Sequence, residues 1–188
     1  MQFCMLPFFI EELSLFDIDR VLKIIKQENK RFVEPIVTTI SRERTPFHVL
    51  ISCLLSLRTM DQTTREASNR LFDVADNPED IMKIPAERLE KLIYPVGFYR
   101  TKARKIKEIC DVLIQTYQGK VPDEIDELLK LNGVGRKTAN LVVTLGYQKP
   151  GICVDTHVHR ITNRWGYVKT NNPHETEFAL REILPKKY

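Results

Sequence analysis

The sequence lacks the cysteine spacings that usually hold metal ions. Its four cysteines stand at positions 4, 53, 110 and 153, so no two of them are close in sequence. Zinc and iron–sulfur sites typically draw on cysteine pairs only a few residues apart, so we expect no metal centre. Cys53, Cys110 and Cys153 have apolar neighbours, which is typical of buried free thiols in a reducing compartment.

The sequence also lacks an apolar run long enough to cross a membrane, which takes about 20 residues. The apolar residues 3–10 are interrupted by Pro7 and followed by Glu11 and Glu12. No basic segment precedes them, so a secretion signal is not indicated. We therefore expect a cytoplasmic protein with no membrane partner, associated with the nucleoid if it binds DNA.

Convincing β-strand patterns, low-complexity segments and internal repeats are absent too, and helical periodicity is present instead. Residues 100–118 place Ile106, Ile109, Cys110 and Leu113 on one face, and Gly119 follows as a stop. The expected fold class is all-α, and 188 residues suffice for one domain or two small lobes. Other helices are expected near 18–25, 46–57, 61–75, 124–131, 135–146, 156–165 and 173–184.

No strong excess of charge of one sign is present. The formal net charge is +4, which by itself is weak support for a nucleic-acid partner. The basic residues do cluster, because five of them lie between positions 100 and 107. Such a cluster fits a solvated helix face or a surface that faces DNA. Its members are Arg100, Lys102, Arg104, Lys105 and Lys107.

The most informative segment is Leu-Asn-Gly-Val-Gly-Arg-Lys-Thr-Ala-Asn at 131–140, which is followed by Val-Asp-Thr-His at 154–157. Gly133 and Gly135 permit a tight turn directly before a helix. Free amides at a helix start attract phosphate, and Lys137 lies in the first turn. Taken alone, Lys137 is best interpreted as a lysine that contacts phosphate. Asp155 lies 18 residues further on.

These two segments together look like a helix–hairpin–helix motif, and they resemble the endonuclease III family of base-excision DNA glycosylases. The resemblance extends over about residues 15–185. It includes further matches at Leu54-Leu55-Ser56 with Thr59 and Asp61, at Gly97 with Tyr99, at Lys102-Ala103 and at Val121-Pro122.

The resemblance implies that Lys137 attacks C1′ of a damaged nucleotide, displaces the base and leaves a Schiff base, from which β-elimination cuts the strand. An amine nucleophile suits this chemistry because it yields an iminium that withdraws electrons. The resemblance also implies that the Asp155 carboxylate stabilises positive charge on the sugar. A helix start and the neighbouring Arg136 should both lower the pKa of Lys137.

The target nucleotide must leave the base stack, and the resemblance implies two side chains that fill the gap. Phe98 would intercalate, although ordinary packing would also account for it, and Arg58 stands where many relatives carry glutamine. His157 matches a histidine beside the site. His157 and His159 are too close in sequence to share a helix face, so a metal is not expected there. Further predicted DNA contacts are Gly133, Val134, Gly135, Arg136 and Thr138 in the hairpin, and Arg100 and Lys102 after the Phe98 loop.

We expect two helical lobes with a DNA cleft between them. Residues 46–140 would form a helical bundle with the helix–hairpin–helix motif, and residues 1–45 with 141–188 would form the second lobe. Family members typically continue with four cysteines that hold a [4Fe–4S] cluster. These ligands are absent from this chain, so either the protein lacks the cluster or the chain is a truncated form, and no cofactor is expected.

The predicted function is bifunctional: removal of oxidised pyrimidines from double-stranded DNA, then AP lyase cleavage, by a monomer. A rival within the same superfamily is an adenine-mismatch or uracil/thymine-mismatch glycosylase. The adenine class carries a catalytic glutamate in the stretch that corresponds to 50–60, where this sequence has none. Outside the enzymes, the sequence also fits a non-catalytic DNA-binding module or a helical protein-interaction scaffold.

Overall fold

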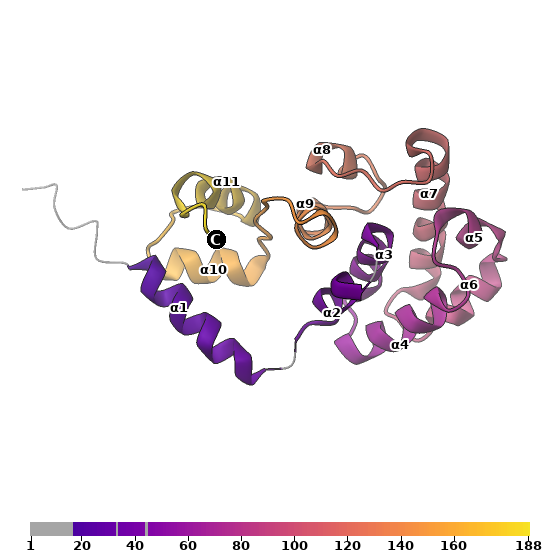
Figure 1. Cartoon of the computed structure of the whole chain (residues 1–188), viewed down its shortest axis with the longest axis horizontal. Coiled ribbons are helices and arrows are strands. Elements are labelled where there is room, and N and C mark those ends of the chain that lie inside the picture. Colours follow the sequence, from indigo (N-terminus) through magenta and orange to yellow (C-terminus); the bar gives the residue numbers. More distant parts are fainter. Residues whose placement is uncertain (1–16, 33, 44) are drawn as a thin grey trace, which may run out of the picture.

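The computed structural model describes residues 17–32, 34–43 and 45–188 of the chain. Within these ranges the secondary structure is helical and contains no β-strand, which confirms the all-α prediction. Figure 1 shows α1, α10 and α11 on one side and α2 to α8 on the other, with α9 between them. No helix in the described ranges is both long and apolar enough to cross a membrane.

The helices are mostly short, and α7 is the longest of those described. Their bounds are α1 (Ile18–Glu28), the 3₁₀ turn η1 (Asn29–Arg31), α2 (Ile36–Glu43), α3 (Pro46–Ser56), α4 (Asp61–Phe72), α5 (Pro78–Lys83), α6 (Ala86–Ile93), α7 (Tyr99–Tyr117), α8 (Ile125–Leu128), α9 (Arg136–Leu141), the π-helical turn η2 (Val142–Gly146), α10 (Thr156–Arg164) and α11 (Pro173–Ile183).

The larger hydrophobic core is built around α3. Every residue from Phe47 to Leu55 is buried, because a helix that is apolar on all sides must be surrounded by other elements. The helix packs against α2, α4, α7, α9 and η2. Since α9 carries Lys137, this central helix supports the backbone of the predicted site.

Helix α7 covers this core as its periodicity predicts. Ile106, Ile109, Cys110 and Leu113 are all buried. The helix ends at Gln118 and Gly119, which have φ angles of +56° and +76°. The amide of Gly119 donates to the carbonyl of Leu113 at 2.9 Å, which satisfies one of the last free carbonyls of the helix.

A smaller core joins α10 and α11 to the segment that precedes α10. It consists of Val154, Val168 and Leu180, with Ile152 and Val158 among the partly buried residues around it. An ion pair of 2.9 Å between Lys187 and Asp19 links the C-terminal residues to α1.

The packing differs from the predicted boundaries at 46 and 140. Ile36, Val37 and Ile40 of α2 belong to the larger core, as do Val142 and Val143 of η2. Residues 30–45 look polar in sequence, but the apolar residues at 36, 37 and 40 lie on one helix face and pack against α3 and α4. Residues 1–16 of the predicted second lobe lie outside the described residues.

The position of α3 yields a test of this core. Leu50 is fully buried, so Leu50→Ala should lower the free energy of unfolding by about 2–5 kcal/mol. Leu57 at the end of the same helix is 42% exposed, and Leu57→Ala should change it by only about 0.5 kcal/mol. Urea denaturation of both variants measures the difference, and equal effects would contradict the assignment of α3 as the centre of the core.

Candidate active site

Lys137 and Asp155 lie together at the starts of two helices. Lys137 is the second residue of α9, and Asp155 is the N-cap of α10. The Lys137 Nζ atom is 3.2 Å from Asp155 Oδ2. The lysine side chain is 49% exposed and the aspartate side chain 29%, so the amine is open to a substrate while the carboxylate is partly sheltered.

The two oxygens of Asp155 have different partners. Oδ1 accepts hydrogen bonds from the amides of His157 and Val158, at 2.9 and 3.0 Å, and so caps α10. Oδ2 faces the lysine. Burial raises the pKa of Asp155, but the Val158 amide and the Lys137 ammonium outweigh it, so this pKa lies below its usual range. The group is therefore a carboxylate at neutral pH.

The segment between α9 and Asp155 is fixed to α9 by Asn140, which is fully buried. The Asn140 side-chain oxygen accepts from the amide of Ile152 at 3.1 Å, and its Nδ2 donates to the carbonyl of Arg136 at 3.0 Å. A Cβ on Gly151 would lie only 2.7 Å from the Thr144 side chain. This close approach brings Asp155 back to Lys137, which lies 18 positions earlier in the sequence.

A buried carboxylate anchors α9 to α11. Glu177 is 2% exposed, and its two oxygens accept from Nε and an Nη of Arg136, both at 2.7 Å. Arg181 donates from Nε to the same carboxylate at 3.1 Å and from Nη2 to the Asn140 side-chain oxygen at 2.8 Å. Burial raises the pKa of Glu177. The hydrogen bonds, of which that from Arg136 contributes most, lower it by a larger amount, so this pKa lies below its usual range. The network holds the smaller core against the helix that carries Lys137.

This network counts against a contact between the Arg136 side chain and DNA. Its guanidinium is engaged by Glu177 and lies 4.8 Å over the ring of Phe178. A side chain that makes a bidentate ion pair and a ring contact within the protein is not free to bind a phosphate. The charge of Arg136 is thus directed at α11.

The hairpin before α9 has an open face and a buried face. Gly133 has a φ of +89° and Gly135 has open space where a Cβ would lie. Val134 and Thr138, by contrast, have buried side chains, and the Val134 amide donates to the carbonyl of Leu131 at 3.0 Å. The Val134 and Thr138 side chains therefore anchor the hairpin in the core, and a contact of these two residues with DNA through the backbone stays a prediction. Lys105 Nζ lies 3.1 Å from the position that a Cβ on Gly133 would take.

The two predicted insertion residues, Arg58 and Phe98, come from different loops that the fold brings together. Phe98 is 65% exposed, and the Arg58 guanidinium carbon lies 5.9 Å from its ring centre. The backbones also touch, since a Cβ on Gly97 would lie 2.6 Å from the carbonyl oxygen of Arg58. Phe98 therefore does not pack in the core. Leu57, Met60 and Tyr94 are exposed apolar side chains of the same two loops.

The basic cluster at 100–107 predicts that Lys102 is a surface residue, but its side chain is buried. It is 8% exposed, and its ammonium donates to the carbonyls of Leu55 and Leu57 at 2.8 and 2.6 Å. Burial lowers the pKa of Lys102 to about 8. The prediction of a direct DNA contact is wrong, because the charged group points into the protein.

The remaining basic candidates have mixed surroundings. Arg100 and Arg104 are exposed, with long ion-pair distances of 3.7 Å to Glu90 and Glu108. Lys107 instead donates to the carbonyl of Met82 at 3.2 Å. His157 is exposed, and its ring lies 3.3 Å from the Arg160 guanidinium. Arg100 and His157 stay predictions as DNA contacts.

The three described cysteines are free thiols in buried or partly buried surroundings. Burial raises the pKa of Cys53 and of Cys110 to about 12, and it also raises the pKa of Cys153. Cluster ligands are thiolates gathered around one point, and the expectation that this chain holds no cofactor stays a prediction. Within the ranges that the structure describes, no three His, Cys, Asp or Glu residues gather as metal ligands would.

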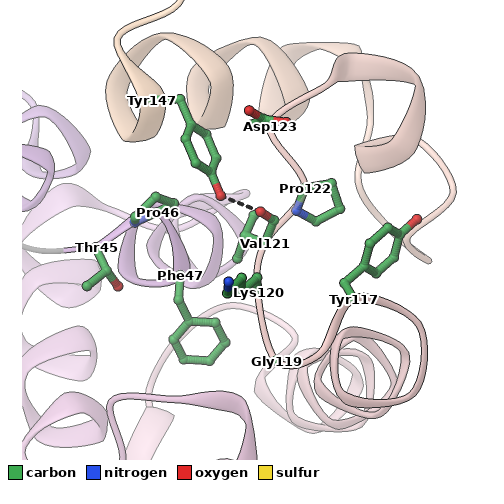
Figure 2. Close-up of a pocket in the computed structure, with 10 residues that line it drawn as sticks. All are labelled: Thr45, Pro46, Phe47, Tyr117, Gly119, Lys120, Val121, Pro122, Asp123 and Tyr147. Atoms are coloured by element: carbon green, nitrogen blue, oxygen red, sulfur yellow. Dashed lines mark hydrogen bonds between the residues drawn. The ribbon is translucent and has the colours of Figure 1, made fainter.

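A pocket of about 570 Å³ lies apart from the lysine and the aspartate. Figure 2 shows it between the start of α3 and the segment that follows α7, where the Tyr147 hydroxyl donates to the carbonyl of Val121. Neither Lys137 nor Asp155 lines it, so it is not the site of their chemistry. The lining residues are Thr45, Pro46, Phe47, Tyr117, Gly119, Lys120, Val121, Pro122, Asp123 and Tyr147.

Sequence reasoning did not find Asn140, Glu177 and Arg181. Asn140 follows Arg136 by one helical turn on the same helix, so a polar residue at a buried position was a usable signal. Glu177 lies 41 residues from Arg136, and no local pattern marks it as the partner.

Comparison with known proteins places these residues in a defined family. Residues 51–186 match the family model described as "HhH-GPD superfamily base excision DNA repair protein". Endonuclease III of Thermotoga maritima is 53% identical over 145 residues, which are 77% of this chain and 68% of that protein. The chain spans a smaller share, 39%, of a longer relative, the chloroplastic endonuclease III homolog 2 of Arabidopsis thaliana, at 44% identity.

Two solved structures share the fold. A non-covalent endonuclease III–DNA complex superposes with a TM-score of 0.77 at 38% identity, over 90% of this chain and 78% of that one. A trapped covalent endonuclease III–DNA intermediate gives 0.76 at 37% identity, over 90% and 79%. These similarities extend over both groups of helices.

The lowered pKa of Asp155 predicts how its ion pair depends on pH. A carboxyl whose pKa is lowered on folding stabilises the protein above its unfolded pKa of about 3.9, and this contribution is lost as the pH falls through the lower folded value. Asp155→Asn removes the charge but keeps an N-cap residue. Urea denaturation should therefore show a wild-type advantage at pH 5 to 7 that shrinks as the pH falls below the unfolded pKa. An advantage that persists at the lowest pH would show that the charge is not its source.

Proposed function

The chain belongs to the endonuclease III family within the HhH-GPD superfamily of base-excision DNA repair proteins, and we propose that Lys137 and Asp155 make it a DNA glycosylase and AP lyase. The observation that carries this proposal is the 3.2 Å pair of an exposed lysine and a partly sheltered aspartate. A covalent DNA intermediate has been trapped in the similar endonuclease III.

Lys137 supplies the nucleophile. The Lys137 ammonium first gives up a proton to water. The resulting neutral amine attacks C1′ of the everted nucleotide, the glycosidic bond breaks, and the base leaves with the bonding electrons and takes up a proton. The nitrogen loses a proton, and its lone pair then forms the iminium as the C1′–O4′ bond of the sugar ring breaks and O4′ takes up a proton. Removal of a C2′ proton breaks the bond to the 3′ oxygen and cuts the strand, and water releases the lysine.

Asp155 acts on the charges of this sequence. Its Oδ2 holds the Lys137 nitrogen in place, and its negative charge stabilises the positive charge that develops on the sugar as the base departs. The second oxygen is committed to capping α10, so the reactive oxygen has a fixed direction. None of these steps requires a metal or a cofactor.

The substrate is double-stranded DNA. Arg58 and Phe98 enter the duplex where the damaged nucleotide leaves it, and the open side of the Gly133–Gly135 hairpin lies against the backbone. Exposed Arg100 and His157 add positive or polar contacts. The enzyme acts as a monomer on oxidised pyrimidines, in the cytoplasm at the nucleoid.

Borohydride trapping on abasic-site DNA tests the nucleophile. The reagent reduces the iminium to a stable amine, so the wild-type protein should give a covalent adduct. Lys137→Ala should abolish it, and Asp155→Asn should slow its formation by roughly 10²-fold or more.

Lys130→Ala is the control, because Lys130 is an exposed lysine of the preceding segment that pairs with Glu127. It should form the adduct at the wild-type rate. An adduct that survives in Lys137→Ala would assign the nucleophile to another residue.

A panel of defined lesions tests the substrate. Duplexes with thymine glycol should be cleaved faster than duplexes with uracil or thymine opposite guanine, under single-turnover conditions with the same protein. Faster release of uracil or thymine would make the protein a mismatch glycosylase and would leave the Schiff-base mechanism intact.

A further inference from the structure

A single buried lysine joins the two loops that carry Arg58 and Phe98. The Lys102 Nζ atom donates to the carbonyls of Leu55 and Leu57 and to the Thr59 hydroxyl, at 2.8, 2.6 and 3.1 Å. An ammonium has three hydrogens to donate, so all of them are used within residues 55–59. Neither Lys137 nor Asp155 is among its partners.

The first two acceptors lie at the C-terminal end of α3. The carbonyls of the last turn of a helix have no intrahelical donors and carry partial negative charge. A buried ammonium at this position satisfies them and interacts favourably with the helix dipole. Lys102 therefore determines where α3 ends and how the chain leaves it towards Arg58.

Thr59 links the Arg58 loop to the Phe98 loop through two hydrogen bonds. Its hydroxyl accepts from Lys102 and also from the amide of Gly97, at 3.1 Å. Gly97 directly precedes Phe98 and has no room for a side chain, because a Cβ would lie 2.6 Å from the Arg58 carbonyl oxygen. The two loops thus form one unit with Lys102 beneath it.

The residues at the tips of this unit have conformations that need support. Arg58 and Phe98 have φ angles of +53° and +58°, which are uncommon for residues other than glycine. Both side chains are exposed, so core packing does not hold them there. The hydrogen bonds that Lys102 and Thr59 form hold the backbone of both loops in place.

We propose that Lys102 is a positioning residue for nucleotide eversion: it holds the Arg58 and Phe98 loops in the relative arrangement in which both side chains enter the DNA duplex together. It does not touch the substrate and takes no part in Schiff-base chemistry. The inference rests on the proposed function, because it assigns a separate step of the same reaction to a separate part of the molecule.

Two substrates separate these steps. A thymine glycol duplex requires that a stacked nucleotide be everted before the lysine reacts. A single-stranded oligonucleotide with a preformed abasic site has no paired base to displace, yet it still reports Schiff-base formation by borohydride trapping. The ratio of the two single-turnover rates therefore measures the contribution of the loops.

Three variants make the comparison. Lys102→Met keeps the length of the side chain and removes the ammonium, whereas Thr59→Val removes only the hydroxyl that links the loops. Lys107→Met is the matched control, because Lys107 lies on the same helix and also donates to a backbone carbonyl, that of Met82. Any general cost of replacing a half-buried lysine of α7 appears in this control.

We expect Lys102→Met to slow excision from the duplex on the order of tenfold to a hundredfold, with less than about a twofold change on the single-stranded substrate. Thr59→Val should shift the ratio in the same direction by a smaller factor, and it decides the question if Lys102→Met does not fold. Lys107→Met should leave the ratio unchanged.

The fluorescence of 2-aminopurine placed opposite the lesion reports unstacking of that base. It should rise when the wild-type protein binds, and it should rise less with Lys102→Met.

Equal losses on both substrates, or no loss on either, would overturn the role of Lys102. A ratio that Lys107→Met alters as much as Lys102→Met would do the same. Absence of any trapped adduct with the wild-type protein would instead overturn the proposed function. The two failures are therefore distinguishable.

Discussion

The bidentate ion pair between Arg136 and the buried Glu177 supports the arrangement of the whole site. It binds α9, which packs on the larger core, to α11 of the smaller core. Arg181 and Asn140 extend this contact to the segment that leads to Asp155. Because a carboxylate buried to this degree is costly without partners, the two groups of helices are held in the one arrangement that satisfies it.

This arrangement explains how two short segments form a reactive pair. Lys137 and Asp155 begin different helices, and neither helix by itself places them together. Asn140 binds the connecting segment to α9, and Gly151 lets the backbones approach closely. The aspartate is further oriented because one of its oxygens caps α10. The lysine consequently meets a carboxylate whose position is set by several contacts outside the pair.

Polar contacts, and not packing of their side chains, fix the Arg58 and Phe98 loops. Their exposed side chains have almost no packing to hold them, and both tips have left-handed backbone conformations. Their order comes from polar groups underneath, where Lys102 and Thr59 satisfy the end of α3 and the amide of Gly97. A surface that must enter a DNA duplex is thereby kept ready without a covering layer of the protein.

Much of this molecule was predictable from local sequence patterns. The helical periodicity of 100–118 and the apolar run after Pro46 depend on neighbouring residues alone, and both helices formed as expected. The resemblance to endonuclease III also indicated Lys137, Asp155, Arg58 and Phe98 as site residues. The sequence left residues 30–45 open as a connection or an irregular helix, because three apolar residues in a polar stretch become a core face only against α3 and α4.

The tertiary structure decided which basic and hairpin side chains face outwards. By itself, the sequence determined the all-α fold and placed a lysine and an aspartate at the starts of two helices. It could not show that the side chains of Val134 and Thr138 turn inwards. Nor could it show this for Lys102 and Arg136, because a charged side chain is buried only where distant segments supply its partners. Those partners are the end of α3 for Lys102 and Glu177 for Arg136, and packing between elements far apart in the chain brought them there.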